Sequence, residues 1–317
     1  MQPKIVVLAT GGTIAGWASS ASSNVDYRAG ELSIAAILRT VPGTTLHGYQ
    51  LESEQIAQLD SKDMNWTVLT SLALRVDELI ASSDVHAVVI THGTDTLEET
   101  AFFLHLVCAP SKLVVLTCAM RPANSYSPDG PSNLADAIAI AGQPSLSGVL
   151  VTCAGRIHSA VDVQKDHPYR LDAFGSGEAG CVGFVEEGRV RFVYVPTVAS
   201  PAVAHQFREK LRAATTSRQW PKIEILVSVT AASGFCVDAL VAQGVDGLVI
   251  AGTGNGTIHH CLESALVRAQ NLGVQVRVTT RCSSGRIIPA TAGKFQHTEG
   301  LNAIKARIAL VLQLLCR

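Results

Sequence analysis

Thr13 stands directly behind two glycines at the end of an apolar run, in the stretch LATGGTIAG at residues 8–16. A similar arrangement occurs in THGTDT at residues 91–96, where Thr94 follows a glycine and precedes Asp95. A threonine hydroxyl is a weak nucleophile and needs a base or a polarising group before it attacks a carbonyl carbon. Two hydroxyls at the ends of predicted strands, one of them beside a carboxylate, indicate acyl transfer to a threonine.

Two further segments would complete such a site. Lys165, in the stretch AVDVQK, is a candidate to hold the Asp95 carboxylate or to relay its proton. Residues 16–27, GWASSASSNVDY, are small and polar without an apolar period, which is typical of a mobile lid. Closure of this lid would bring Tyr27 over the site and exclude water.

Other readings of these glycine-rich turns remain open. A dinucleotide site requires GxGxxG and a P-loop requires GxxxxGK[ST], and neither threonine loop fits. A third loop, GTGNGT at residues 252–257, ends in Thr257 where the last glycine is due. The glycines before Thr13 would also serve a purely structural tight turn, and Thr94 with Asp95 would also serve as the cap of the following helix.

Cysteine and histidine do not form a recognisable metal motif. The eight cysteines include no CxxC pair, and most lie in apolar surroundings, which indicates buried and reduced thiols. His259 and His260 are adjacent, so we expect their side chains to point in different directions and to chelate an ion poorly. His92 is interpreted as a hydrogen-bonded structural residue rather than as a general base. We predict no metal and no other cofactor.

Composition excludes several classes of protein. The chain has 317 residues, of which 47% are hydrophobic and 16% are charged, and its net charge is −1. This near-neutral charge gives no reason to expect nucleic acid or an anionic membrane surface as a partner. No apolar run approaches the roughly 20 residues that span a bilayer. The sequence enters its first strand-like segment without an apolar leader, so we expect a cytoplasmic protein.

Short apolar runs alternate with helical patterns, which is typical of βαβ units and of an α/β fold with a mostly parallel sheet. Strands are predicted at residues 4–9, 85–90, 112–117, 148–153, 223–229, 247–251 and 275–279, with a hairpin at 184–195. Helices are predicted at residues 32–38, 67–82, 96–108, 133–141, 204–214, 234–243, 259–271 and 302–315. The rhythm is lost over residues 197–221, which predicts a linker between domains at 1–196 and 222–317.

The motifs resemble the signature segments of the bacterial L-asparaginase family, which includes the glutaminase-asparaginases. The two most specific are ATGGTIAG and THGTDTLEETAFFL, and the others are LDSKDMN, AMRPANSYSPDGPSNL, GTGNG and GLNAIKARIALVLQLL. The resemblance covers nearly the whole chain. It implies a larger N-terminal and a smaller C-terminal α/β domain, and a homo-oligomer, a dimer or a tetramer, with sites built between two subunits.

The resemblance also implies a role for each site residue. Thr13 matches the nucleophile, Tyr27 the lid tyrosine that sits against it, and Thr94, Asp95 and Lys165 a triad-like relay. The residues implied to bind substrate are Gly12, Ser61, Gly93, Thr94 and Asp95. Among them, Ser61 would contact the α-carboxylate of the substrate and Asp95 its α-ammonium group, and backbone N–H groups of the two glycine-bearing loops would stabilise the oxyanion.

The implied reaction is hydrolysis of L-asparagine to L-aspartate and ammonia through a threonine acyl-enzyme, with L-glutaminase side activity and without a cofactor. A non-hydrolytic aspartate or asparagine sensor is the alternative. Two departures from the family pattern bear on this alternative. Thr257 stands where many members have asparagine, and residues 280–295 contain no acid, although homotetrameric members place there a glutamate that reaches a neighbouring subunit's substrate. Loss of that carboxylate would weaken capture of the ammonium group.

Overall fold

The computed structural model describes residues 2–41, 48–214, 220–288, 293–298 and 300–317. The chain divides into two compact units, Met1–Thr215 and Thr216–Arg317. None of the described helices is both long and apolar enough to cross a bilayer.

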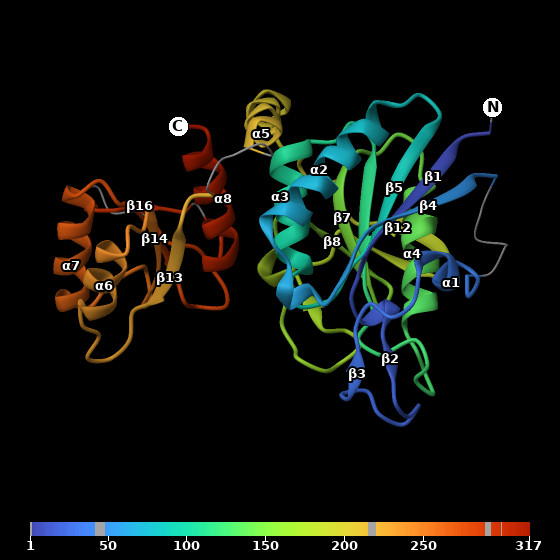
Figure 1. Cartoon of the computed structure of the whole chain (residues 1–317), viewed down its shortest axis with the longest axis horizontal. Coiled ribbons are helices and arrows are strands. Elements are labelled where there is room, and N and C mark those ends of the chain that lie inside the picture. The colour runs from blue at the N-terminus through green and yellow to red at the C-terminus, as the bar shows by residue number, and fades with distance from the viewer. Residues whose placement is uncertain (1, 42–47, 215–219, 289–292, 299) are drawn as a thin grey trace. The chain divides into compact units, whose positions relative to one another are not determined.

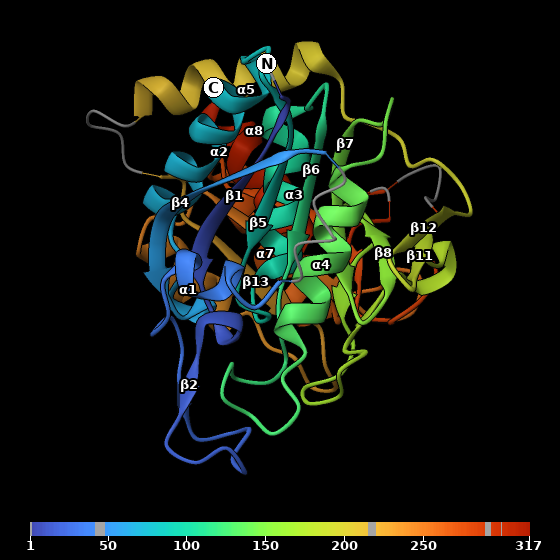
Figure 2. The same cartoon turned by 90° about the vertical axis from the view of Figure 1, so that its right-hand side faces the viewer.

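The first unit is built on an eight-stranded sheet with the order β12-β11-β8-β7-β6-β5-β1-β4 (Figures 1 and 2). Five strands are parallel, namely β4 (Gln50–Leu59), β1 (Lys4–Gly11), β5 (Val85–Thr91), β6 (Leu113–Thr117) and β7 (Gly148–Cys153). Antiparallel pairing adds β8 (Arg156–Ser159), β11 (Gly183–Glu186) and β12 (Arg189–Phe192). The inner parallel strands are almost wholly buried, as expected for a sheet that is covered on both faces.

Helices cover both faces of this sheet (Figures 1 and 2). One face packs on α1 (Ile34–Leu38) and α4 (Gly130–Ala141) through a cluster that includes Ile5, Val7 and Leu134. The other face packs on α2 (Trp66–Ala81) and α3 (Leu97–Cys108). Helix α5 (Pro201–Ala214) lies in the stretch predicted as a linker and packs on α3 and α2. The domain boundaries themselves stay a prediction.

Short turns and two-stranded ribbons accompany the large sheet of the first unit. The 3-10 turn η1 (Thr13–Ala15) follows β1, and η3 (Ser61–Asp63) follows β4. The segment predicted as a lid begins and ends in a two-stranded ribbon, β2 (Trp17–Ala18) and β3 (Tyr27–Arg28), in which Ala18 is paired with Tyr27. A second ribbon pairs β9 (Gln164–Lys165) with β10 (Phe174–Gly175), and η4 (Gly177–Ala179) follows it.

The second unit has a four-stranded parallel sheet, in the order β13 (Ile223–Val227), β14 (Gly247–Gly252), β15 (Gln275–Thr280) and β16 (Gln296–His297). Helices α6 (Phe235–Ala242) and α7 (His260–Asn271) pack on one face of it through Val237, Leu262 and Leu266. Helix α8 (Ala303–Leu315) packs against β13, β14 and β15. The predicted class, α/β with a larger N-terminal and a smaller C-terminal sheet, is confirmed.

Candidate active site

The loops that follow β1 and β5 meet through two glycines. A Cβ atom on Gly12 would overlap the Cα and N atoms of Gly93, and one on Gly93 would overlap the Ser61 hydroxyl. Gly12 also has φ +81°, a conformation that glycine adopts without strain. Each glycine is followed directly by a threonine, so this close approach brings Thr13 and Thr94 to the same edge of the sheet.

Thr13 is 5% exposed at the start of η1, and its hydroxyl is hydrogen-bonded to the phenol of Tyr27 at 2.7 Å. Burial raises the pKa of Tyr27, a tendency that the hydrogen bond from Thr13 opposes in part. The phenol is therefore neutral at physiological pH. Gly16 makes room for the ring, since a Cβ there would lie 2.9 Å from Cδ2 of Tyr27.

Thr94 and Asp95 share one lysine. The ammonium of Lys165, on β9, donates to Thr94 Oγ1 at 2.9 Å and to Asp95 Oδ1 at 2.6 Å. Thr94 is buried, whereas the Asp95 side chain is 54% exposed. The alternative that Thr94 and Asp95 cap the next helix is wrong, because the N-cap residue of α3 is Thr96.

Ser61 connects the loop after β4 to this group. It is 2% exposed, its Oγ accepts a hydrogen bond from the backbone N–H of Asp95 at 3.2 Å, and its carbonyl accepts one from Thr96 Oγ1 at 2.8 Å. With a lone pair committed to that N–H, the hydroxyl proton of Ser61 is directed toward other acceptors. A buried hydroxyl fixed in this way is suited to donate to a substrate carboxylate.

His92 is fully buried between the strand and the glycine. Its Nδ1 lies 2.7 Å from the Gly93 carbonyl and its Nε2 lies 2.9 Å from Thr100 Oγ1. Burial lowers the pKa of His92 to about 4, so the ring is neutral at physiological pH. Both ring nitrogens have partners, which agrees with the structural interpretation and leaves none for general-base catalysis.

The segment predicted as a lid is held down by the loop before α4. The Asn124 side-chain amide both accepts from Ala18 N at 2.8 Å and donates to Ala18 O at 2.7 Å. Ser125 Oγ donates to Asn24 Oδ1 at 2.7 Å, and Ala123 N donates to the carbonyl of Gly16 at 2.9 Å. Ala18 is paired with Tyr27 across the ribbon, so these contacts bear on where Tyr27 lies.

The sequence patterns did not identify Asn124 and Gly16 as contributors to the site, although both lie inside motifs that were singled out.

In the second unit, the loop after β14 is closed by a bridge between Thr253 and Thr257, whose hydroxyls lie 2.7 Å apart. The acid-free stretch beyond β15 lies partly outside the described residues, which omit 289–292 within it.

The contacts of the first unit therefore form two linked sets. Thr13 is bonded to Tyr27, while Lys165 joins Thr94 to Asp95, whose backbone N–H holds Ser61. The contact between Gly12 and Gly93 joins the two sets. A buried hydroxyl beside a neutral phenol, and a second hydroxyl on a lysine paired with a carboxylate, are groups with which a protein can carry out acyl transfer to a threonine.

Comparisons with known proteins show the family of the chain. A family model described as "Asparaginase, N-terminal" matches residues 4–198, and one described as "Glutaminase/Asparaginase C-terminal domain" matches residues 222–316. The chain belongs to the asparaginase family.

Individual relatives are similar over almost the full chain. L-asparaginase 2 of Bacillus subtilis (strain 168) is 35% identical over 98% of this chain and 82% of its own length. A glutaminase-asparaginase of Pseudomonas fluorescens biotype A is 35% identical over 98% of this chain and 86% of its own length. The crystal structure of a probable cytoplasmic L-asparaginase from Campylobacter jejuni superposes with a TM-score of 0.89 at 35% identity, covering 99% of this chain and 95% of that one.

Proposed function

We propose that this chain is an asparaginase-type amidohydrolase, which converts L-asparagine and water to L-aspartate and ammonia and has L-glutaminase side activity. The observation that carries the proposal is the hydroxyl of Thr13, buried at a strand end and 2.7 Å from the Tyr27 phenol. The names of the relatives support the same substrates, L-asparagine and L-glutamine.

In the proposed first step, Thr13 Oγ1 attacks the side-chain amide carbon of the substrate. The C–N bond breaks, the nitrogen leaves as ammonia after taking up a proton, and a β-aspartyl ester of Thr13 forms. Tyr27 orients the Thr13 hydroxyl and relays the proton of that hydroxyl. It acts as a neutral phenol and not as a phenolate base, because burial raises its pKa. Water then hydrolyses the ester and regenerates Thr13.

The second hydroxyl is assigned to proton movement. Lys165 donates to Thr94 Oγ1 at 2.9 Å and to Asp95 Oδ1 at 2.6 Å, so the three groups form a continuous hydrogen-bonded path along which a proton can move. We assign this set to activation of the attacking water and to protonation of the leaving nitrogen. Steps of this kind typically contribute about 10²–10⁴-fold to the rate.

Substrate recognition follows from the charges of an amino acid. Ser61 donates its hydroxyl to the α-carboxylate, and the half-exposed carboxylate of Asp95 accepts from the α-ammonium group. The N–H of Gly12 is committed to the Leu59 carbonyl at 2.9 Å, so Gly12 serves the site by allowing the close approach to Gly93. Stabilisation of the oxyanion is therefore assigned to the backbone N–H groups of Thr13 and Thr94, which lie further along the two loops.

A homo-oligomer, dimer or tetramer, belongs to the same proposal, with no nucleic-acid or membrane partner. The Asp95 side chain is 54% exposed in the single chain, so a second subunit has room to cover it. Sedimentation equilibrium on the purified protein measures the subunit number.

The cytoplasm is the proposed location, in line with the description of the Campylobacter jejuni protein, and cell fractionation tests this proposal.

The test is ammonia release from L-asparagine and, separately, from L-glutamine. Thr13→Val removes the hydroxyl at nearly constant volume and is expected to abolish release, while Thr13→Ser keeps a hydroxyl and retains part of it. Thr70→Val is the matched control, because Thr70 is a buried threonine on α2 whose hydroxyl has no partner among the described residues. Full activity of Thr13→Val would contradict the proposal. Tight binding of asparagine by wild type without ammonia release would favour the sensor.

A further inference from the structure

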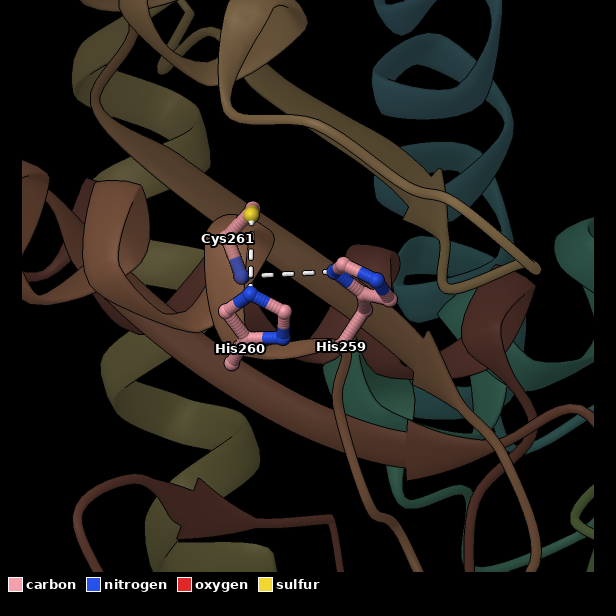
Figure 3. A group of neighbouring side chains, drawn as sticks. All are labelled: His259, His260 and Cys261. Atoms are coloured by element: carbon pink, nitrogen blue, oxygen red, sulfur yellow. Dashed lines mark hydrogen bonds between the residues drawn. The ribbon is translucent and has the colours of Figure 1, made fainter.

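Three potential metal ligands lie together where α7 begins (Figure 3). The rings of His259 and His260 are stacked, with centroids 4.5 Å apart and planes inclined by 27°. Nε2 of His260 lies 3.2 Å from Sγ of Cys261. A ring nitrogen of each histidine and the cysteine sulfur all lie within 4.8 Å of one another. The expectation that the adjacent histidines point in different directions is therefore wrong.

The start of the helix explains this convergence. His259 is the N-cap residue with φ −57° and ψ 134°, outside helical geometry, whereas His260 is the first residue of α7. The change in chain direction between them turns the two side chains to the same side. In a regular helix or strand, consecutive side chains would diverge.

We propose that His259, His260 and Cys261 bind a single borderline-soft divalent metal ion of the zinc class. Imidazole nitrogen and thiolate sulfur are the ligands that such ions select over magnesium and calcium. Typical zinc bond lengths and a tetrahedral arrangement place neighbouring ligand atoms about 3.4–3.6 Å apart. The three ligand atoms already lie within 4.8 Å of one another, and water would complete the coordination.

The hydrogen bonds already present show that the ligand atoms can carry lone pairs. Nδ1 of His259 accepts from the backbone N–H of Cys261 at 3.3 Å, and a metal ion at this nitrogen would replace that hydrogen bond. The short contact between His260 and Cys261 places one proton between nitrogen and sulfur. A metal ion takes the place of that proton, which is released to solvent as the thiol becomes a thiolate.

Access and electrostatics decide which ions fit. His260 and Cys261 are exposed and His259 is half-buried, so an ion enters directly from solvent. The partial positive charge at the start of α7 opposes any bound cation. It therefore disfavours hard ions, which depend on charge alone, and leaves ions that form a strong bond to sulfur.

Calorimetric titration of the metal-free full chain with zinc chloride tests the proposal, and cobalt(II) serves as a spectroscopic probe. We expect one zinc ion per chain, and a thiolate-to-cobalt charge-transfer band in the near ultraviolet. Cys261→Ser and His260→Gln should each weaken zinc binding by at least about 100-fold, the upper end of what loss of an outer-shell partner costs. His259→Asn separates two roles, because asparagine keeps an N-cap acceptor but removes the ring ligand.

Cys236→Ser and Cys282→Ser are the matched controls, since these are the other exposed cysteines among the described residues. Both should bind zinc as wild type does. Circular dichroism establishes that each variant is folded. Absence of zinc binding at millimolar concentration, absence of the charge-transfer band, or unchanged affinity in Cys261→Ser would overturn the proposal. Unchanged affinity in His259→Asn would remove His259 from the ligand set and overturn the three-ligand site.

Discussion

Gly12 and Gly93 approach each other so closely that a Cβ atom on Gly12 would overlap backbone atoms of Gly93. This contact joins the loop after β1 to the loop after β5, and each loop carries a threonine in the next position. The two hydroxyls, their phenol and lysine partners, and the buried Ser61 therefore depend on one point of backbone contact.

Gly12→Ala tests the importance of this contact. The φ of +81° alone costs about 1–3 kcal/mol for a side-chain-bearing residue, and the overlap with Gly93 adds to it. We expect the free energy of unfolding, measured by urea denaturation, to fall by more than about 3 kcal/mol, and ammonia release by the folded fraction to be lost.

Gly188→Ala is the control for the cost of placing a side chain at positive φ, because Gly188 has φ +71° and open space around its Cβ position. It should lose stability only by the cost of that φ and should keep its activity. Equal losses of stability and unchanged activity in the two variants would show that the contact with Gly93 is unimportant.

Lys165→Met tests the shared lysine. Removing the ammonium leaves the buried Thr94 hydroxyl and the Asp95 carboxylate without their common donor, so we expect kcat to fall by about 10²–10⁴-fold. Lys4→Met is a matched control, because Lys4 also pairs with two carboxylates, those of Glu52 and Asp84, at the surface. Comparable activity of Lys165→Met and Lys4→Met in a steady-state ammonia assay would refute the role of Lys165.

Asn124→Ala tests how the lid is positioned. It removes the two hydrogen bonds to Ala18, each worth about 1 kcal/mol, and a change of about 1.4 kcal/mol corresponds to a factor of ten in population. Loss of both bonds, about 2 kcal/mol, predicts a fall of roughly 30-fold in kcat/KM, and limited proteolysis within residues 16–27 should become faster.

Asn302→Ala controls for a general loss of stability, because Asn302 caps α8 in the second unit through Lys305 N at 2.9 Å. It should leave proteolysis of residues 16–27 unchanged. If Asn124→Ala left both proteolysis and kcat/KM as in wild type, the loop at residues 121–126 would not hold the lid.

The lowered pKa of the buried His92 predicts how the free energy of unfolding depends on pH. Its pKa is about 4 in the folded protein, where burial disfavours the charged ring, and its ordinary value is 6.5. A lowered pKa contributes stability that is fully present above pH 6.5 and is lost as pH falls toward 4. The loss is about 3 kcal/mol, from about 1.4 kcal/mol per pKa unit.

His92→Gln should remove much of this acid sensitivity in urea denaturation between pH 7 and 4, although the variant is less stable at pH 7. His205→Gln, a change at an exposed histidine of α5, should retain the wild-type pH dependence. An unaltered acid dependence in His92→Gln would contradict the assignment.

Sequence patterns predicted the inner strands and the threonine loops because both carry strong local signals. Strands β1, β5 and β6 are buried on both faces and are therefore continuous apolar runs. Strand β4, QLESEQIAQL, was missed because it is an edge strand whose residues are largely exposed or half-buried, so no apolar run marks it.

Contacts between distant loops were harder to predict from local patterns. The hydrogen bonds of Asn124 to Ala18 span 106 positions, and no periodicity signals them. The convergence of His259 and His260 depends on the N-cap geometry of α7, and the side-chain directions of a regular element gave the wrong expectation. In contrast, Thr13, Thr94 and Asp95 lie in motifs long enough to be recognised.

The most direct test of the central claim is to trap the acyl-enzyme. The protein is mixed with L-asparagine, quenched in acid during turnover, digested, and analysed by mass spectrometry. We predict a β-aspartyl ester on the hydroxyl of Thr13 in the wild type and none in Thr13→Val. An ester on Thr94 instead, or full ammonia release by Thr13→Val, would contradict the assignment of Thr13 as the nucleophile.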